Sequence, residues 1–163
     1  MQGHKVYIGL GSNLGDRIAH LREAVRQVQN ILTVDKVSQL YVAAPLGYVR
    51  NDAFINAALS GRTQLKPMDL LLQLQAIERK LGRRRVQYGP RPIDLDILFY
   101  GALQIDAPGL TIPHPRLADR AFVLKPLVDI DPKLMHPVLY YTVSQLLHEA
   151  EDADQVNVYT PSP

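Results

Sequence analysis

The stretch Asp94-Leu95-Asp96-Ile97-Leu98-Phe99-Tyr100 decides how this 163-residue chain folds. Its apolar residues at positions 95, 97 and 99 alternate with Asp94, Asp96 and Leu98, which predicts a β-strand with one apolar face. Because side chains in a strand repeat every two residues, both carboxylates point to the same side, about 6.5 Å apart along the backbone. Carboxylates this close repel each other unless a cation lies between them, so they are candidate Mg²⁺ ligands. A solvated strand face with a surface ion pair is the alternative interpretation.

The segments before this strand complete a recognisable order of elements. Hydrophobic periodicity predicts strands over residues 5–10, 34–42 and 53–60 and helices over about 18–32 and 67–81, the second ending at a glycine. The order β-α-β-β-α-β is the split βαβ, or ferredoxin-like, pattern. The expected fold class is therefore α+β, with an antiparallel sheet and helices packed on it.

The segments after the strand are shorter. A hairpin is expected between residues 103 and 112, and helices are expected over 121–128 and 143–150. The polar tail from about residue 152 ends in prolines and is expected to be loosely held. No repeat and no linker divides the sequence, so residues 1–163 are expected to form a single domain.

Composition restricts the class of protein. The chain is 47% hydrophobic and 21% charged, as is usual for globular proteins, and its net charge is only +2. It has no cysteine, which excludes disulfides, thiolate metal sites and cysteine nucleophiles. No apolar run approaches the length of a membrane span and no signal peptide is recognisable at the N-terminus, so a cytoplasmic location is the default expectation.

Positive charge is concentrated between Arg79 and Arg91. The six basic residues there, with no acid among them, are Arg79, Lys80, Arg83, Arg84, Arg85 and Arg91. Arginine suits phosphate because its planar fork binds two oxygens and keeps its charge. Arginines that hold phosphate, next to acids that hold a metal, indicate phosphoryl transfer. A solubilising helix end is the alternative interpretation of this cluster.

Three other features are candidate site elements. Phe54 and Asn56 lie on the strand face opposite the expected core, where they could stack a flat heterocycle and bond its edge, or pack under a helix. His114, between two prolines, could contact phosphate or be structural. The glycines of residues 9–15 do not have the dinucleotide-fingerprint spacing, and no Walker A loop occurs.

Together these segments resemble 6-hydroxymethyl-7,8-dihydropterin pyrophosphokinase, an enzyme family of folate biosynthesis. The matching stretches are Tyr7–Gly15, Pro45–Gly47, Phe54–Ala58, Gly89–Ile97 and Ile112–Arg116, with Arg120 and Phe122. The resemblance implies transfer of the β,γ-pyrophosphoryl group of ATP, the co-substrate, to the hydroxymethyl oxygen of the pterin, with release of AMP.

The resemblance also implies roles for individual residues, some of them outside these stretches. The expected catalytic residues are Arg83, Arg91, Asp94 and Asp96, with both carboxylates as ligands of two Mg²⁺ ions. The expected pterin-binding residues are Ala43, Ala44, Leu46, Phe54, Asn56 and Phe122, the two phenylalanines stacking on the ring. The expected ATP-binding residues are Gln75, Glu78, Arg83, Arg85, Tyr88, Arg91, Ile97, Thr111, His114 and Arg120.

Two other functions stay open at this point. An RNA-binding module shares the ferredoxin-like order, and Val6–Leu10 loosely resembles the first strand motif of such modules, but the aromatic pair on a later strand is missing. A metal-dependent phosphohydrolase would also use paired carboxylates. From the resemblance, the expected partners are the small molecules ATP and hydroxymethyl dihydropterin, with no nucleic acid and no membrane. The chain is expected to be a monomer, with an oligomer left open.

Overall fold

The structure, a computed structural model, describes residues 3–43, 53–82 and 92–159. Strands and helices follow one another as β1 (His4–Ser12), α1 (Arg17–Val28), β2 (Thr33–Val37), β3 (Tyr41–Ala43), β4 (Ile55–Thr63), α2 (Pro67–Lys80), β5 (Asp94–Tyr100), β6 (Ile105–Ala107), β7 (Leu110–Ile112), α3 (Ala121–Ile130), α4 (Val143–Glu149) and β8 (Val156–Val158). Short 3₁₀ turns precede α3 and β8. None of the helices in these three ranges has the length and hydrophobicity needed to span a bilayer.

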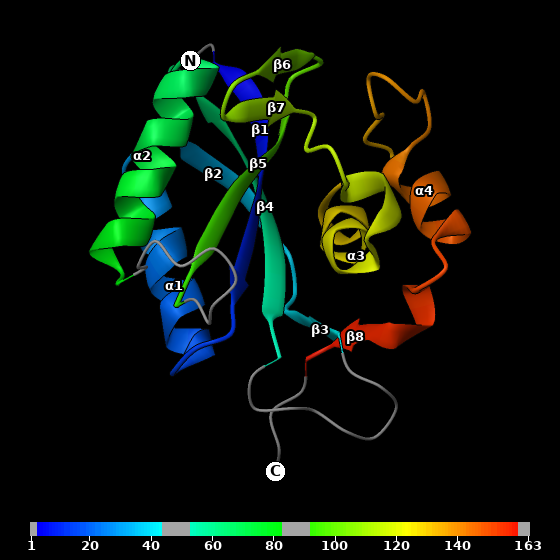
Figure 1. Ribbon diagram of the computed structural model, residues 1–163, viewed down its shortest axis with the longest axis horizontal. Helices are drawn as coiled ribbons and strands as arrows, with labels where there is room; N and C mark the ends of the chain where they lie inside the picture. The colour runs from blue at the N-terminus through cyan, green and yellow to red at the C-terminus, as the bar shows by residue number, and fades with distance from the viewer. Residues whose placement is uncertain (1–2, 44–52, 83–91, 160–163) are drawn as a thin grey trace.

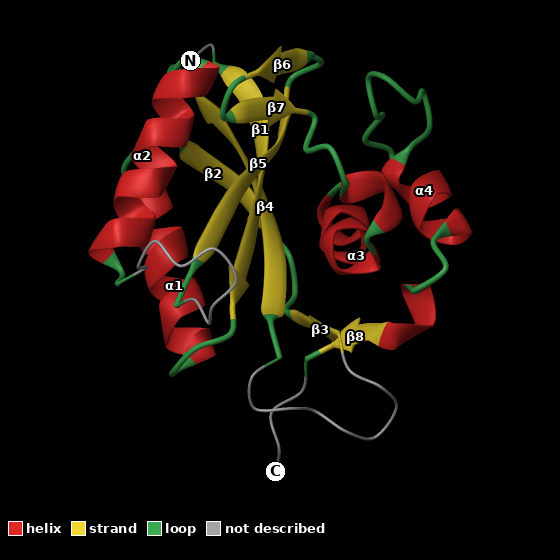
Figure 2. Ribbon diagram, viewed as in Figure 1, coloured by secondary structure: helices red, strands yellow, loops and turns green. Residues whose placement is uncertain are grey.

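The main sheet has the strand order β5-β1-β4-β3-β8, and β2 also pairs with β4. The pairings are antiparallel, and β1 lies between β4 and β5. Helices α1 and α2 cover one face of this sheet, while α3 and α4 cover the other (Figures 1 and 2). This arrangement confirms the predicted α+β class and its ferredoxin-like order. The predicted hairpin is also confirmed, as the separate pair β6 and β7.

The two long helices begin and end where local sequence signals place them. Asp16 caps α1 by accepting a hydrogen bond of 3.1 Å from the backbone N–H of Ala19. Pro67 is the first residue of α2, and Gly82 follows that helix with a φ of +99°, a conformation that favours glycine. Helix α1 stops at Val28, so the buried Leu32, expected in the helix, belongs to the turn that follows it.

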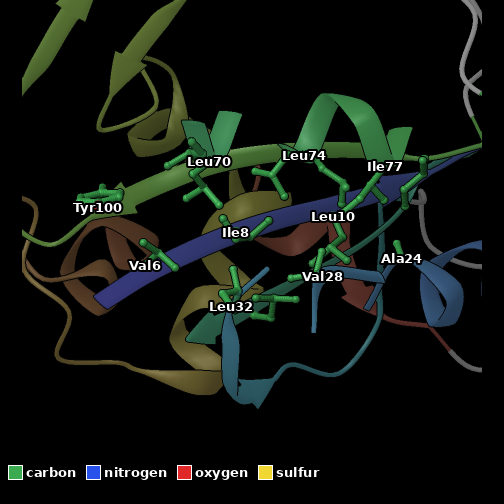
Figure 3. Packing of buried hydrophobic residues seen from close by; sticks show 14 of the residues in the cluster. Val6, Ile8, Leu10, Ala24, Val28, Leu32, Leu70, Leu74, Ile77 and Tyr100 are labelled. Carbon is green, nitrogen blue, oxygen red and sulfur yellow. The ribbon is translucent and has the colours of Figure 1, made fainter. Parts of the chain in front are cut away.

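The largest core cluster lies between the sheet and the helices α1 and α2. Val6, Ile8 and Leu10 point from β1 toward this layer (Figure 3). They pack with Val28 of α1 and Leu74 of α2, all of them buried. The opposite face of the sheet carries a second cluster against α3 and α4. Burial on both faces fixes the sheet between its two helical layers.

A β-bulge in β5 corrects one expectation. Ile8 pairs with Ile97 but Tyr7 pairs with Phe99, so Leu98 is the extra residue. The alternation therefore shifts, and Phe99 packs in the α3 layer instead of sharing a face with Leu95 and Ile97. Tyr100 takes the place expected for Phe99 in the first core cluster.

The predicted strand over residues 34–42 is divided into β2 and β3. At the break, the Ser38 hydroxyl accepts a hydrogen bond of 2.9 Å from the Ala58 N–H and donates one of 2.7 Å to the Gln39 carbonyl. A side chain that replaces a backbone group in this way interrupts the regular ladder. The next strand, β4, starts two residues later and ends three residues later than predicted.

The C-terminal segment takes part in the fold as far as it is described, to residue 159, and the loosely held tail from about residue 152 stays a prediction. Residues 156–158 form β8, which pairs with β3, and the Tyr159 N–H donates a 2.8 Å hydrogen bond to the Leu40 carbonyl. Val156 is only 1% exposed and packs with Tyr41 and Ala121. The tail is polar in composition, but this one buried valine gives it an apolar anchor.

We expect Val156→Ala to lower the free energy of unfolding by about 2 kcal/mol, because it removes two buried methyl groups. The matched control is Val158→Ala in the same strand, where the side chain is 46% exposed and the loss should stay below about 0.5 kcal/mol. Urea unfolding followed by circular dichroism measures both. Equal midpoints for the two variants and the parent chain would contradict the packing of β8.

Candidate active site

A cavity of about 350 Å³ opens on the α3 side of the sheet. Its walls come from β1, β5, the end of β3, the start of β4 and the first turn of α3. The predicted site residues that line it are Ala43, Phe54, Asn56, Asp94, Asp96, His114, Arg120 and Phe122. The fold thus brings together residues that are separated by as much as half of the sequence.

Two glycines of the central strand form the floor of this cavity. Gly11 pairs with Asn56 on one side and Asp94 on the other, and Gly9 pairs with Asp96. A Cβ atom added to Gly11 would lie 2.9 Å from Asn56 Oδ1 and 3.3 Å from Phe54 Cδ1. Glycine is therefore required at this position, because a side chain would displace the amide and the ring.

Asp94 and Asp96 lie on this floor, half-buried, at the start of the edge strand β5. Their shared direction is the one that strand periodicity predicts. Among the described residues, no group of three or more His, Cys, Asp or Glu side chains forms a metal cluster. Two carboxylates are nevertheless the protein contribution that suits Mg²⁺, which takes its other ligands from water and from phosphate oxygens. These two residues could therefore hold a divalent cation.

Two aromatic rings line the cavity from different layers of the fold. Phe54 directly precedes β4, and Phe122 belongs to the first turn of α3. The guanidinium carbon of Arg120 lies 5.5 Å from the centre of the Phe122 ring, a cation–π distance. Asn56, itself buried, supplies an amide to the same cavity. Aromatic surface with one amide is suited to a flat, polar-edged ring.

His114 reaches the cavity from the segment between β7 and α3. Its backbone N–H donates to the Leu98 carbonyl at 3.1 Å, and its Nδ1 accepts from the Arg116 N–H at 3.4 Å. Burial lowers the pKa of His114, and the positive charge of Arg120 lowers it further, while Asp94 acts in the opposite direction. The imidazole is therefore neutral near pH 7, and Nε2, since Nδ1 accepts, carries the proton that can be donated.

Four predicted ATP-binding residues do not line the cavity: Gln75, Glu78, Ile97 and Thr111. Glu78 is 7% exposed and accepts a 2.8 Å hydrogen bond from the Leu95 N–H, so it supports the strand that carries the carboxylates. The side chain of Ile97 is part of the core under α1 and α2, which leaves only its backbone for a ligand. Six further predicted residues lie outside the described residues, namely Ala44, Leu46, Arg83, Arg85, Tyr88 and Arg91. Their roles stay predictions.

Several lining residues were not singled out from the sequence as site residues. They are Gly9, Leu10, Gly11, Ala53, Ala57, Leu98 and Val123. For the glycines a signal existed, since two glycines spaced by two in an apolar strand predict one face without side chains. The apolar members carry no such signal, because the same residue types fill the core.

Comparison with known proteins gives a consistent family match. Residues 7–132 match the family model described as 7,8-dihydro-6-hydroxymethylpterin-pyrophosphokinase (HPPK). A 2-amino-4-hydroxy-6-hydroxymethyldihydropteridine pyrophosphokinase of Aquifex aeolicus is 40% identical over 134 residues, which are 82% of this chain and 84% of that protein. The enzyme of the same name from Bacillus subtilis is 46% identical over 127 residues, 76% of each chain.

Other relatives are much longer than this chain. The folic acid synthesis protein fol1 of Pneumocystis carinii is 45% identical over 151 residues, which cover 91% of this chain but only 20% of that protein. A crystal structure of Plasmodium falciparum HPPK-DHPS matches with a TM-score of 0.75 at 16% identity, covering 96% of this chain and 48% of that one. At this identity the structural match shows the fold.

Because the pKa of His114 is lowered, we expect its NMR titration midpoint to lie below the ordinary value of 6.5. The neutral form is favoured in the folded chain, so the stability it contributes is present above pH 6.5 and is lost as the pH falls through the lowered pKa. Arg120→Gln should raise the midpoint, and Asp94→Asn should lower it further. Shifts of the same sign in both variants would contradict this electrostatic arrangement.

Proposed function

Since this chain belongs to the 7,8-dihydro-6-hydroxymethylpterin-pyrophosphokinase family, we propose that it transfers the pyrophosphoryl group of ATP to the hydroxymethyl oxygen of 6-hydroxymethyl-7,8-dihydropterin and releases AMP. One observation carries the proposal. The carboxylates of Asp94 and Asp96 share a single cavity with the rings of Phe54 and Phe122. A carboxylate pair suited to a phosphate-bound metal and two rings suited to stacking therefore line the same cavity.

The pterin would occupy the aromatic part of the cavity. Phe54 and Phe122 would stack on the bicyclic ring, and Asn56 would bond its polar edge. Ala43, at the end of β3, lies where its backbone could complete the edge contacts. The floor at Gly11 leaves room for the ring without displacing Asn56.

The phosphates would lie over the carboxylates. Asp94 and Asp96 would hold two Mg²⁺ ions, which when bound neutralise phosphate oxygen charge. His114 would donate from Nε2 as a neutral group, and Arg120 would add a positive charge. Arg83, Arg85 and Arg91 would add further positive charge from the basic segment. Phosphoryl transfer depends mainly on such positioning and charge neutralisation.

The proton of the attacking hydroxyl needs an acceptor. Asp96 lies in the cavity and is the side chain that we propose for this part, or for holding the metal that lowers the hydroxyl pKa. Water would compete with the pterin as acceptor of the pyrophosphoryl group, so closure of the site is part of the proposal.

Family membership favours pterin pyrophosphorylation over the two alternatives. A concave cavity that joins carboxylates and aromatic rings suits a small molecule more than a nucleic acid, which stacks on the open face of a sheet. The proposed partners are thus ATP and the pterin. A cytoplasmic location and a monomeric state stay predictions from the sequence.

The decisive measurement is AMP release from ATP and Mg²⁺, with and without 6-hydroxymethyl-7,8-dihydropterin. We expect release to require the pterin and to fall about a hundredfold or more in Asp96→Asn, which removes one carboxylate ligand of the proposed Mg²⁺ ions. Asp106→Asn, the same change at an exposed position of β6, is the matched control. Equal AMP release without the pterin would indicate a hydrolase instead.

Phe54→Ala should weaken pterin binding about tenfold, because it removes one stacking surface, and should change ATP binding less than twofold. Calorimetry with each ligand separates the two effects. Tyr140→Ala, which truncates an aromatic ring that is 75% exposed and does not line the cavity, serves as the control. A larger loss for ATP than for the pterin would remove Phe54 from the pterin site.

A further inference from the structure

The N-terminus of α3 carries two cavity residues but has no cap of its own. The residue at the N-cap position is Arg120, and its side chain makes no capping hydrogen bond. Ser, Thr, Asp or Asn is usual there, because a side-chain oxygen then accepts from a free backbone N–H of the first turn. The Arg120 side chain instead lines the cavity and lies over the Phe122 ring.

The missing acceptor comes from a residue about thirty positions later. The Ala121 N–H donates to both carboxylate oxygens of Asp152, at 3.3 Å to Oδ1 and 3.4 Å to Oδ2. A carboxylate at this end of a helix is also favoured by the helix dipole. Asp152 therefore caps α3 between Arg120 and Phe122, and the N-cap residue is left to serve the cavity.

The segment that contains Asp152 is tied to the same wall at further points. The Lys125 ammonium of α3 donates to the Val156 carbonyl, and Val156 pairs with Ala43 of β3. Val156, Tyr41 and Ala121 form a small buried cluster against which Phe122 packs. One C-terminal segment thus holds α3 and β3, the two elements that supply Phe122 and Ala43 to the cavity.

The Phe54 side of the cavity has a support in which this segment takes no part. Phe54 and Asn56 belong to β4 and the residue before it, and β4 is held by β1 along its whole length. The C-terminal segment also lies beyond residue 132, where the family match ends. The slot, meaning the part of the cavity lined by Phe54 and Phe122, is therefore held on the Phe54 side by the sheet and on the Phe122 side also by residues outside that match.

The geometry points to Asp152 as a positioning residue for the pterin slot, which acts through the N-terminus of α3 on the placement of Phe122. This inference rests on the proposed function, since it assigns the slot to the pterin. It predicts that Asp152 and Phe122 are energetically coupled in pterin binding. Asp152 should matter for pterin binding only as long as the Phe122 ring is present.

A double-mutant cycle tests this coupling. The parent chain, Asp152→Ala, Phe122→Ala and the double variant are titrated with 6-hydroxymethylpterin by calorimetry, and their melting temperatures are recorded. We expect Asp152→Ala to weaken binding about fivefold in the parent chain and less than about 1.5-fold in the Phe122→Ala background. Equal factors in both backgrounds, or no loss in the parent background, would overturn the inference.

Three further variants complete the experiment. Asp152→Asn keeps an acceptor oxygen, so its affinity for the pterin should be within twofold of that of the parent chain. A loss of affinity as large as that of Asp152→Ala would overturn the capping role. Asp154→Ala, an exposed neighbour in the same segment, should have no effect. Lys125→Met removes the hydrogen bond from α3 to the Val156 carbonyl. Its effect on pterin binding should depend on Phe122 in the same way, which keeps the test valid if Asp152→Ala does not fold.

The AMP assay separates this inference from the proposed function. If the parent chain releases AMP only with the pterin while the cycle is additive, the inference fails and the proposed function stands. If the parent chain releases no AMP and does not bind the pterin, the proposed function fails, and the assignment of the slot fails with it.

Discussion

The central strand β1 has to satisfy two opposite requirements, and the remainder of the structure depends on this constraint. One of its faces carries Val6, Ile8 and Leu10 into the core beneath α1 and α2. The other face has no side chain at Gly9 and Gly11, directly between the carboxylates of β5 and the amide of β4. A strand that was apolar on both faces would fill the cavity, and one that was small on both faces would lose the core.

The two strands that flank β1 supply different chemical groups to the cavity. Strand β5 brings two carboxylates, and its bulge at Leu98 then turns the following residues so that Phe99 packs in the α3 layer. Strand β4 and the residue before it bring Asn56 and Phe54, which would contact the ring. Because β1 pairs with both strands through backbone hydrogen bonds, the spacing of the two chemical groups is set by sheet geometry, which side-chain packing alone could not fix so closely.

The sequence predicted well what depends on local periodicity and poorly what depends on distant partners. The strand over 94–100, the helix that starts at Pro67, and the shared face of Asp94 and Asp96 follow from spacing and capping signals. The break at Ser38 and the burial of Val156 could not be found in this way, because each depends on a partner in another strand. The floor of the cavity has a local signal in Gly9 and Gly11, two glycines spaced by two in an apolar strand.

The position of α3 couples the two halves of the candidate site. Arg120 and Phe122 are separated by one residue, and the charge of the first lies over the ring of the second. Arg120 also acts on His114, since its positive charge lowers the pKa of that imidazole. A shift of the N-terminus of α3 would therefore move the Phe122 ring and the Arg120 charge together. In the proposed reaction, a shift of α3 would therefore change both where the pterin stacks and where positive charge meets the phosphates. The carboxylates of β5, and Phe54 next to β4, would stay in place.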